Sequence, residues 1–138
     1  MNGNSIISAA ISYIEDNLHE DLSLDDIEKK LNYSKFYINR LFVKRVGCTM
    51  HKYIQARRLT EAARYLTETD KPIVEIAFEA HYNSQQAFTA AFQQLYRCTP
   101  KIYRKNGIFY PMKTRITMQT RIPRYQNPAS MWGGNIAA

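Results

Sequence analysis

The first apolar residues of the chain recur at steps of three and four positions, as they do along one face of an α-helix. This stripe consists of Ile7, Ile11, Ile14 and Leu18, and it follows a capping Asn4 or Ser5. The spacing predicts one amphipathic helix from about residue 5 to 19. We expect its apolar face to support a core.

Two further helices separated by a tight turn are predicted next. Ser23 stands three residues before Asp26, which is the spacing of a capping box, and it opens a short helix at about 24–31. A break at residues 32–33 separates this helix from a longer, basic helix at about 34–47. The apolar positions are Leu24, Ile27 and Leu31 in the short helix, and Phe36 or Tyr37, Ile38, Leu41, Phe42 and Val46 in the longer one.

The same arrangement of short helix, turn and longer helix occurs a second time, at about 73–98. With an offset of 50 residues, Ser34, Phe42, Cys48, Thr49 and Tyr53 recur as Ser84, Phe92, Cys98, Thr99 and Tyr103. Upstream of the turn the offset is 49, and Leu24, Ile27 and Tyr33 recur as Ile73, Ile76 and Tyr82. A repeat that slips by one residue only at a turn indicates two copies of one structural unit.

A long helix is predicted between the two copies, from about 49 to 68, before Asp70-Lys71-Pro72 ends it. A helix of about 20 residues spans roughly 30 Å. Recognition helices in successive major-groove faces of DNA lie about 34 Å apart. The length therefore favours DNA binding. The alternative is two helical hairpins packed on a central helix, which leaves the basic residues unexplained.

Charge is distributed unevenly along the 138 residues. The net charge of +7 combines −5 for residues 1–32, +6 for 33–68, −1 for 69–98 and +7 for 99–138. Basic blocks beside acidic or near-neutral ones indicate a localised positive face of the kind that binds a polyanion. A solvated surface without such a partner is the alternative.

Several classes of protein are disfavoured. The amino terminus has no basic stretch followed by an apolar run, and no window approaches 18 apolar residues, which argues against secretion and membrane spanning. Cys48 and His51 suggest a metal or nucleophile site, but both cysteines occupy equivalent repeat positions, which favours core packing. No phosphate loop or catalytic motif is present. We therefore expect that the protein is not an enzyme and that it binds neither a cofactor nor a metal ion.

The residues from 5 to 105 resemble the AraC/XylS family of transcriptional regulators. The most specific pieces are Tyr33-Ser34-Lys35-Phe36 with Arg40-Leu41-Phe42, Tyr53-Ile54 with Arg57-Arg58-Leu59 and Ala62, and Ser84-Gln85-Gln86 with Phe88, Phe92, Thr99-Pro100 and Tyr103-Arg104. The Ser84-Gln85-Gln86 opening, with no large effector domain before it, is most similar to the MarA/SoxS/Rob group. The resemblance implies an all-α domain over 1–105 with seven helices, in which a central helix joins two helix-turn-helix subdomains.

The resemblance also implies which side chains read DNA. Arg40 can donate to O6 and N7 of a guanine, a contact worth about 1 to 3 kcal/mol of discrimination. Phe36 and Asn39 share its face and can contact a thymine methyl and an adenine edge, although a core role for Phe36 is the alternative. The corresponding residues of the second recognition helix are Gln85, Gln86 and Thr89.

The second recognition helix departs from the subgroup, which usually has Arg where this chain has Ala90 and Thr where it has Ala87. We therefore predict that the first helix-turn-helix dominates sequence reading. The second mainly positions the protein through phosphates and groove shape.

Phosphate contacts are expected from helix starts, whose backbone N–H groups favour anions, and from nearby bases. The candidates are Ser34, Lys35, Lys44, Arg45, Arg57, Arg58, Ser84, Lys101, Arg104 and Lys105. For Arg57 and Arg58, pairing with Glu61 is an equal alternative.

Three further positions depart from the family. Asn32 and His81 replace the usual turn glycines, and both residue types tolerate the left-handed backbone that such turns need. A pH-sensing role for His81 is the less favoured alternative. Glu28 replaces a small Ala, so we expect it to loosen the first helix-turn-helix unless its side chain packs outward.

Residues 106–138 differ in character from the rest. They contain three of the five prolines, three of the five glycines, Trp132 and no acid. Alternation at Ile116, Met118, Thr120 and Ile122 is typical of a β-strand. So few apolar residues cannot form a core, so we expect a flexible linker. The start of a further domain and a basic arm along DNA are alternatives.

Together these features predict a bacterial, cytoplasmic, nucleoid-associated regulator that binds double-stranded DNA as a monomer and has no membrane partner. Its resemblance alone implies that it recruits RNA polymerase and activates stress or drug-tolerance genes. Two alternatives remain. One is a non-specific nucleic-acid binder with a weakened second unit, and the other is a protein-interaction module that uses the acidic first helix and the tail.

Overall fold

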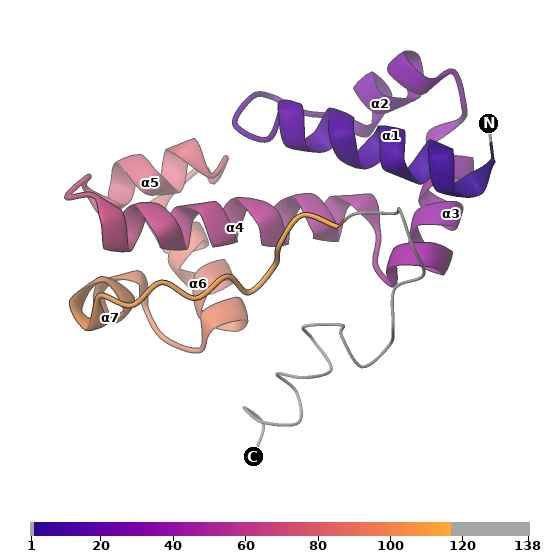
Figure 1. Ribbon diagram of the computed structural model, residues 1–138. Coiled ribbons are helices and arrows are strands. Elements are labelled where there is room, and N and C mark those ends of the chain that lie inside the picture. The colour runs from indigo at the N-terminus through magenta and orange to yellow at the C-terminus, as the bar shows by residue number, and fades with distance from the viewer. Residues whose placement is uncertain (1, 117–138) are drawn as a thin grey trace. The chain divides into compact units, whose positions relative to one another are not determined.

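The computed structural model describes residues 2–116, which form seven α-helices and no strand (Figure 1). The predicted all-α fold is thereby confirmed. The helices belong to two compact units, each described here by itself. The N-terminal unit comprises, of the described residues, 2–16, 23–50 and 115–116, and the C-terminal unit comprises 17–22 and 51–114. The strand and tail expected beyond residue 116 lie outside the described residues.

The N-terminal unit contains α1 (Gly3–Asp16), α2 (Leu24–Leu31) and α3 (Lys35–Val46), which contact one another pairwise. Each helix turns its apolar stripe inward, as the sequence periodicity predicts. The buried residues are Ile6, Ile7, Ala10, Ile11 and Ile14 of α1, Ile27 of α2, and Ile38 and Phe42 of α3.

Helix α1 ends at Asp16, earlier than its apolar periodicity predicts. Leu18 continues the stripe in sequence, yet it is buried in the C-terminal unit. Arg58 explains the difference, because its Nε donates to the Leu18 carbonyl at 2.9 Å and its Nη2 donates to the Glu20 carbonyl at 2.8 Å. These two bonds hold residues 17–22 against the next long helix.

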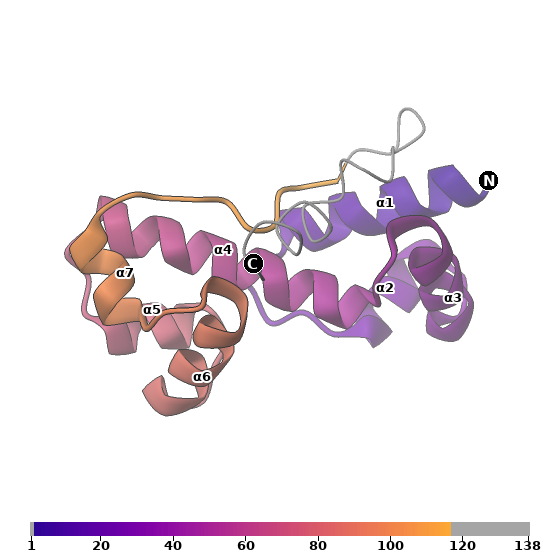
Figure 2. The ribbon, with the colours of Figure 1, turned by 90° about the horizontal axis from the view of Figure 1, so that it is seen from below.

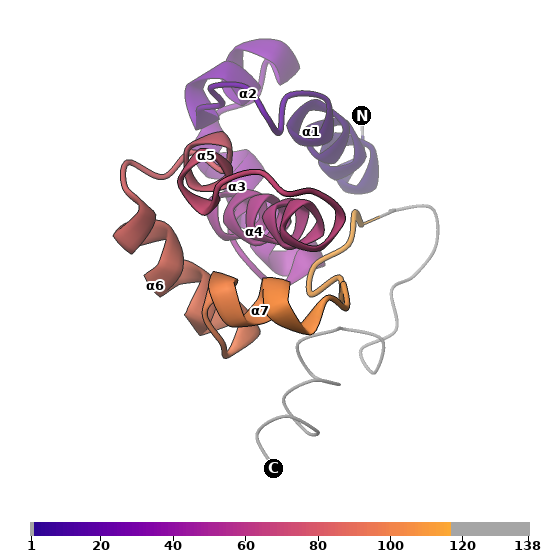
Figure 3. The ribbon, with the colours of Figure 1, turned by 90° about the vertical axis from the view of Figure 1, so that its left-hand side faces the viewer.

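The C-terminal unit is built on α4 (Met50–Glu68), whose first residue belongs to the N-terminal unit. Helices α5 (Ile73–Glu79), α6 (Gln85–Tyr96) and α7 (Pro100–Asn106) gather around α4 (Figures 2 and 3). Their shared core contains Leu59, Ala62, Ala63, Leu66, Ile76, Ala77, Ala80, Phe88, Phe92, Tyr96 and Tyr103.

Helix ends follow local sequence signals. Ser23 and Asp26 form the predicted capping box, and the hydroxyl of Ser34 caps α3 as that of Ser84 caps α6. The turns at Asn32 and His81 adopt φ values of 62° and 69°, which confirms the left-handed backbone expected there. Arg97, the repeat equivalent of Gly47, also has a positive φ of 65°.

Residues 107–114, which the sequence analysis assigned to a flexible tail, return along α4 after α7 ends (Figure 1). Backbone groups at 110, 112 and 113 make hydrogen bonds to side chains of α4, α6 and α7. This part of the chain therefore belongs to the C-terminal unit.

The aromatic core of the C-terminal unit gives a stability prediction. The Phe92 ring lies 4.7 Å from that of Tyr96, 5.6 Å from that of Phe88 and 5.4 Å from that of Tyr103, measured between centroids. Phe92→Ala should lower the free energy of unfolding by about 3 to 5 kcal/mol, because it leaves a cavity among these rings. Denaturant unfolding measures this loss. Gln93→Ala, at the exposed neighbouring position, should change it by less than about 0.5 kcal/mol, and equal losses would contradict the assignment of the core.

Candidate nucleic-acid interface

The buried residues of α3 determine which of its side chains face solvent. Ile38 and Phe42 are fully buried, so residues on the opposite side of the helix face solvent. Phe36 is 70% exposed, which contradicts the core role considered for it. Arg40 is exposed, and among residues 2–116 its guanidinium makes no hydrogen bond or ion pair. The structure therefore brings Phe36 and Arg40 together on one accessible surface.

Asn39 is half-buried beside them and has a structural partner. Its Oδ1 accepts a hydrogen bond from the backbone N–H of Met50 at 3.0 Å, where α4 begins. This bond uses one of the two lone pairs of the amide oxygen and leaves the NH₂ group as donor. Since a bidentate contact with adenine uses both the oxygen and the nitrogen of the amide, a base-reading role for Asn39 competes with its bond to α4.

Two carboxylates of α2 occupy the N-terminus of α3. Glu28 Oε2 accepts a hydrogen bond from the Lys35 backbone N–H at 3.0 Å, and Asp25 pairs with the Lys35 ammonium. Glu28 therefore ties α2 to α3, whereas the sequence predicted that it would loosen the first helix-turn-helix unless its side chain packed outward. The start of α3 was expected to bind phosphate. These contacts instead use the backbone N–H of Lys35 and pair its ammonium group with a carboxylate.

The ion pair between Asp25 and Lys35 shifts the pKa of both side chains. The hydrogen bond and charge of Lys35 lower the pKa of Asp25 below its usual 3.8, and Asp25 raises the pKa of Lys35 above its usual 10.5. A lowered carboxyl pKa contributes stability that is present at neutral pH and is lost as the pH falls through the folded-state value. The raised ammonium pKa contributes stability that is lost as the pH rises through its folded-state value. The pair is thus intact across the neutral range.

The exposed face of α6 is neutral. Gln85, Gln86, Thr89, Ala90 and Gln93 line one shallow open depression on this helix. The first three are the base-reading candidates predicted from the sequence, and Gln93 was not among them. Helical spacing from Gln86 could have found it. This face offers amide groups, a hydroxyl and methyl groups, and no charge.

The N-terminus of α6 differs from that of α3. The Ser84 hydroxyl accepts from the Ala87 N–H at 3.1 Å, just as Ser34 accepts from Tyr37. At the repeat positions of Asp25 and Glu28, however, the chain has Val74 and Ala77. The carboxylates that neutralise the start of α3 therefore have no counterparts at the start of α6.

The predicted phosphate ligands fall into two groups. The guanidiniums of Arg45, Arg57, Arg58 and Arg104 bond to groups of the protein itself. In the part of the chain that the structure describes, Lys44, Lys101 and Lys105 are exposed and make no hydrogen bond or ion pair. Arg57 is only 8% exposed and donates to Glu61 at 3.3 Å and to the Lys113 carbonyl at 3.0 Å.

Arg58 and Arg104 each donate to two main-chain carbonyls. Arg58 binds those of Leu18 and Glu20, and burial lowers the pKa of its guanidinium. Arg104 donates from Nε to the Leu66 carbonyl at 2.9 Å and from Nη2 to that of Thr69 at 3.3 Å. Such fork geometry suits a structural role. Among the predicted phosphate ligands, the three exposed lysines are thus the cations without a bond to another described residue.

Within residues 2–116, no cluster of three or more His, Cys, Asp or Glu side chains is arranged to hold a metal. Over the same residues, no helix has the length and apolar character needed to cross a bilayer.

Comparisons with known proteins identify the family to which the chain belongs. The family described as "Helix-turn-helix domain" matches residues 27–106. The transposon Tn10 TetD protein of Escherichia coli is 44% identical over 105 residues, which cover 76% of this chain and 76% of that protein. The transcriptional activator AarP of Providencia stuartii is 38% identical over 107 residues, which cover 78% of this chain and 79% of that protein.

A solved structure shows the same fold. The crystal structure of a transcriptional regulator from Chromobacterium violaceum, described as an AraC-type DNA-binding domain-containing protein, superposes with a TM-score of 0.71. The two chains are 30% identical, and the match covers 75% of this chain and 92% of the other.

The Asp25–Lys35 pair can be tested by titration. In the wild type, the NMR-monitored carboxyl of Asp25 should titrate below 3.8, and Lys35→Met should bring its pKa back toward that value by removing the partner charge. Lys30→Met, at an exposed position of the same unit, should leave the pKa of Asp25 unchanged. An Asp25 that titrates at its usual value in the wild type would show that the pair does not form in solution.

Proposed function

Since the chain belongs to the AraC-type family of helix-turn-helix transcriptional regulators, we propose that it binds a specific DNA sequence by inserting α3 and α6 into the major groove. The observation that carries this proposal is the exposed face of α3. Arg40 has no internal partner among the described residues and Phe36 is largely exposed, on a helix whose other side is anchored in a core. The ring of Phe36 and the guanidinium of Arg40 are therefore both available to a ligand on the same helix face.

Base reading falls mainly to α3. The guanidinium of Arg40 suits O6 and N7 of a guanine, and the ring of Phe36 suits a thymine methyl group. Asn39 contributes through its NH₂ group, because its oxygen accepts from Met50. On α6, Gln85, Gln86 and Thr89 contact base edges without adding charge.

Positioning on the DNA backbone falls to the exposed lysines and to the start of α6. Lys44, Lys101 and Lys105 can reach phosphates, and Ser84 opens a helix N-terminus without neighbouring carboxylates at the repeat positions. Ser34, Lys35, Arg45, Arg57, Arg58 and Arg104 are weaker candidates for phosphate contact, since each already bonds to protein groups.

We extend the proposal to activation of stress or drug-tolerance genes by a monomer that recruits RNA polymerase in the bacterial cytoplasm. The support for activation is similarity, since AarP is described as a transcriptional activator. The relatives are regulators of transcription rather than enzymes.

A non-specific nucleic-acid binder is the second candidate. The neutral face of α6 favours it, because that helix lacks the arginine whose donors discriminate guanine most strongly. The two candidates differ in one measurable property, which is the preference of the protein for one sequence over others.

Arg40 provides the test. Arg40→Ala should reduce the preference for a selected genomic site over random duplex by about 5- to 150-fold, which corresponds to the loss of one bidentate base contact. Lys44→Ala, the matched control on the same helix, should weaken binding to both DNAs alike and reduce the slope of log K against log salt by about 1. Competition binding across a salt series measures both effects.

The outcomes separate the candidates. If the wild type has no preference between the selected site and random duplex, the protein binds DNA non-specifically. If the preference exists and survives Arg40→Ala, another residue reads the sequence and the assignment of Arg40 is wrong.

A further inference from the structure

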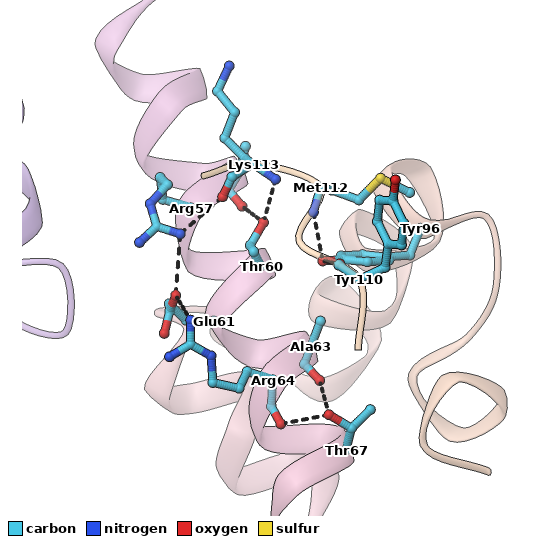
Figure 4. Close-up of polar contacts among 11 residues, drawn as sticks. Arg57, Thr60, Glu61, Ala63, Arg64, Thr67, Tyr96, Tyr110, Met112 and Lys113 are labelled. Carbon is cyan, nitrogen blue, oxygen red and sulfur yellow. Dashed lines mark hydrogen bonds and ion pairs between the residues drawn. The ribbon is translucent and has the colours of Figure 1, made fainter. Parts of the chain in front are cut away.

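The chain that follows α7 makes a set of directed contacts with the helices of the C-terminal unit. The family match ends at residue 106, and residues 107–114 lie along α4 beyond it (Figures 1 and 4). We call residues 109–113 the clasp.

Two tyrosine hydroxyls hold the middle of the clasp. Tyr96 Oη donates to the Tyr110 carbonyl at 2.7 Å and accepts from the Met112 N–H at 3.3 Å. Tyr103 Oη accepts from the Tyr110 N–H at 2.7 Å. The hydroxyl of Tyr96 is thus used both as donor and as acceptor, and burial raises the pKa of Tyr96.

The end of the clasp is fixed to α4. The Lys113 N–H donates to Thr60 Oγ1 at 3.1 Å, and Thr60 Oγ1 donates in turn to the Ala56 carbonyl at 2.8 Å. The Lys113 carbonyl accepts from Arg57 Nη1 at 3.0 Å, and Arg57 is oriented by Glu61 (Figure 4). Because Thr60 is 1% exposed and Arg57 8%, these bonds are shielded from water.

The other side of this network is a recognition helix. Tyr96 is the last residue of α6, and its ring stacks on that of Phe92 with 4.7 Å between centroids and an interplanar angle of 14°. The Tyr103 ring meets the Tyr96 ring edge-on at 4.9 Å. The clasp therefore connects the carboxyl end of α6 to α4 by way of one buried aromatic residue.

From these contacts we propose that the clasp positions α6 for DNA recognition, with Tyr96 and Thr60 as its positioning residues. The inference rests on the proposed function and extends it to a segment beyond the family match. If the clasp positions α6, then the affinity that the protein gains from the half-site bound by α6 depends on hydrogen bonds that do not contact DNA.

The chemistry of α6 makes its position critical. Its outward face carries amides and a hydroxyl but no charge. Hydrogen bonds weaken steeply when their geometry is distorted, whereas the attraction of a cation to phosphate varies slowly with position. A small rotation of α6 therefore costs more binding than the same rotation of a helix that bears cations.

The experiment uses the full chain and a selected DNA site in which either half-site is scrambled. Tyr96→Phe keeps the stacked ring but removes its hydroxyl, and Thr60→Val removes the hydroxyl from α4 with little change of shape. Each should reduce the affinity penalty for scrambling the half-site bound by α6 by about threefold to tenfold. The penalty for scrambling the half-site bound by α3 should stay at its wild-type value. Thr60→Ser, which retains the hydroxyl, should behave as the wild type.

Each remaining outcome is informative. If Tyr96→Phe and Thr60→Val leave both penalties at wild-type values, or reduce the two equally in proportion to lost thermal stability, the clasp only stabilises the fold and the inference is overturned. A wild type that is indifferent to both scrambled half-sites overturns the proposed function, and this inference with it.

Discussion

The narrow apolar stripe of each recognition helix is the constraint on which the rest of the structure depends. Helix α3 is anchored by Ile38 and Phe42, and α6 is anchored by Phe88 and Phe92, which stand at the equivalent positions of the 50-residue repeat. Side chains four residues apart lie on one face, so burying them fixes the rotation of the helix about its axis. That rotation determines which residues remain exposed to meet a ligand.

The basic side chains fall into two groups according to whether they bond to other groups of the protein. Guanidiniums that could attract phosphate instead bind carbonyl groups, as Arg58 does for residues 17–22 and Arg104 does at the end of α4. Lys44 and Lys101 are instead exposed and make no hydrogen bond or ion pair within the described part of the chain. At the start of α3, Glu28 accepts from the backbone N–H of Lys35 and Asp25 pairs with its ammonium group. Net charge alone therefore overestimates the number of groups available to DNA.

Local signals in the sequence predicted much of the fold. The capping serines, the bounds of α2 at 24–31 and the left-handed turns at Asn32 and His81 depend on neighbours within a few residues. Contacts between distant segments could not be predicted, because periodicity carries no information about them. The bond from Met50 to Asn39, the burial of Leu18 away from α1, and the clasp at Thr60 are of this kind. The bond from the backbone N–H of Lys35 to Glu28 could not be predicted for the same reason, since the two residues lie on either side of a turn.

The central claim is that Arg40 reads a guanine from the exposed side of α3, and interference by guanine methylation tests it most directly. A methyl group on N7 removes the acceptor that Arg40 would use in the major groove. The account predicts one guanine in the bound site at which N7 methylation blocks the wild type but has no further effect on Arg40→Ala. Binding of the wild type that is unaffected by methylation at every guanine of the site would contradict it.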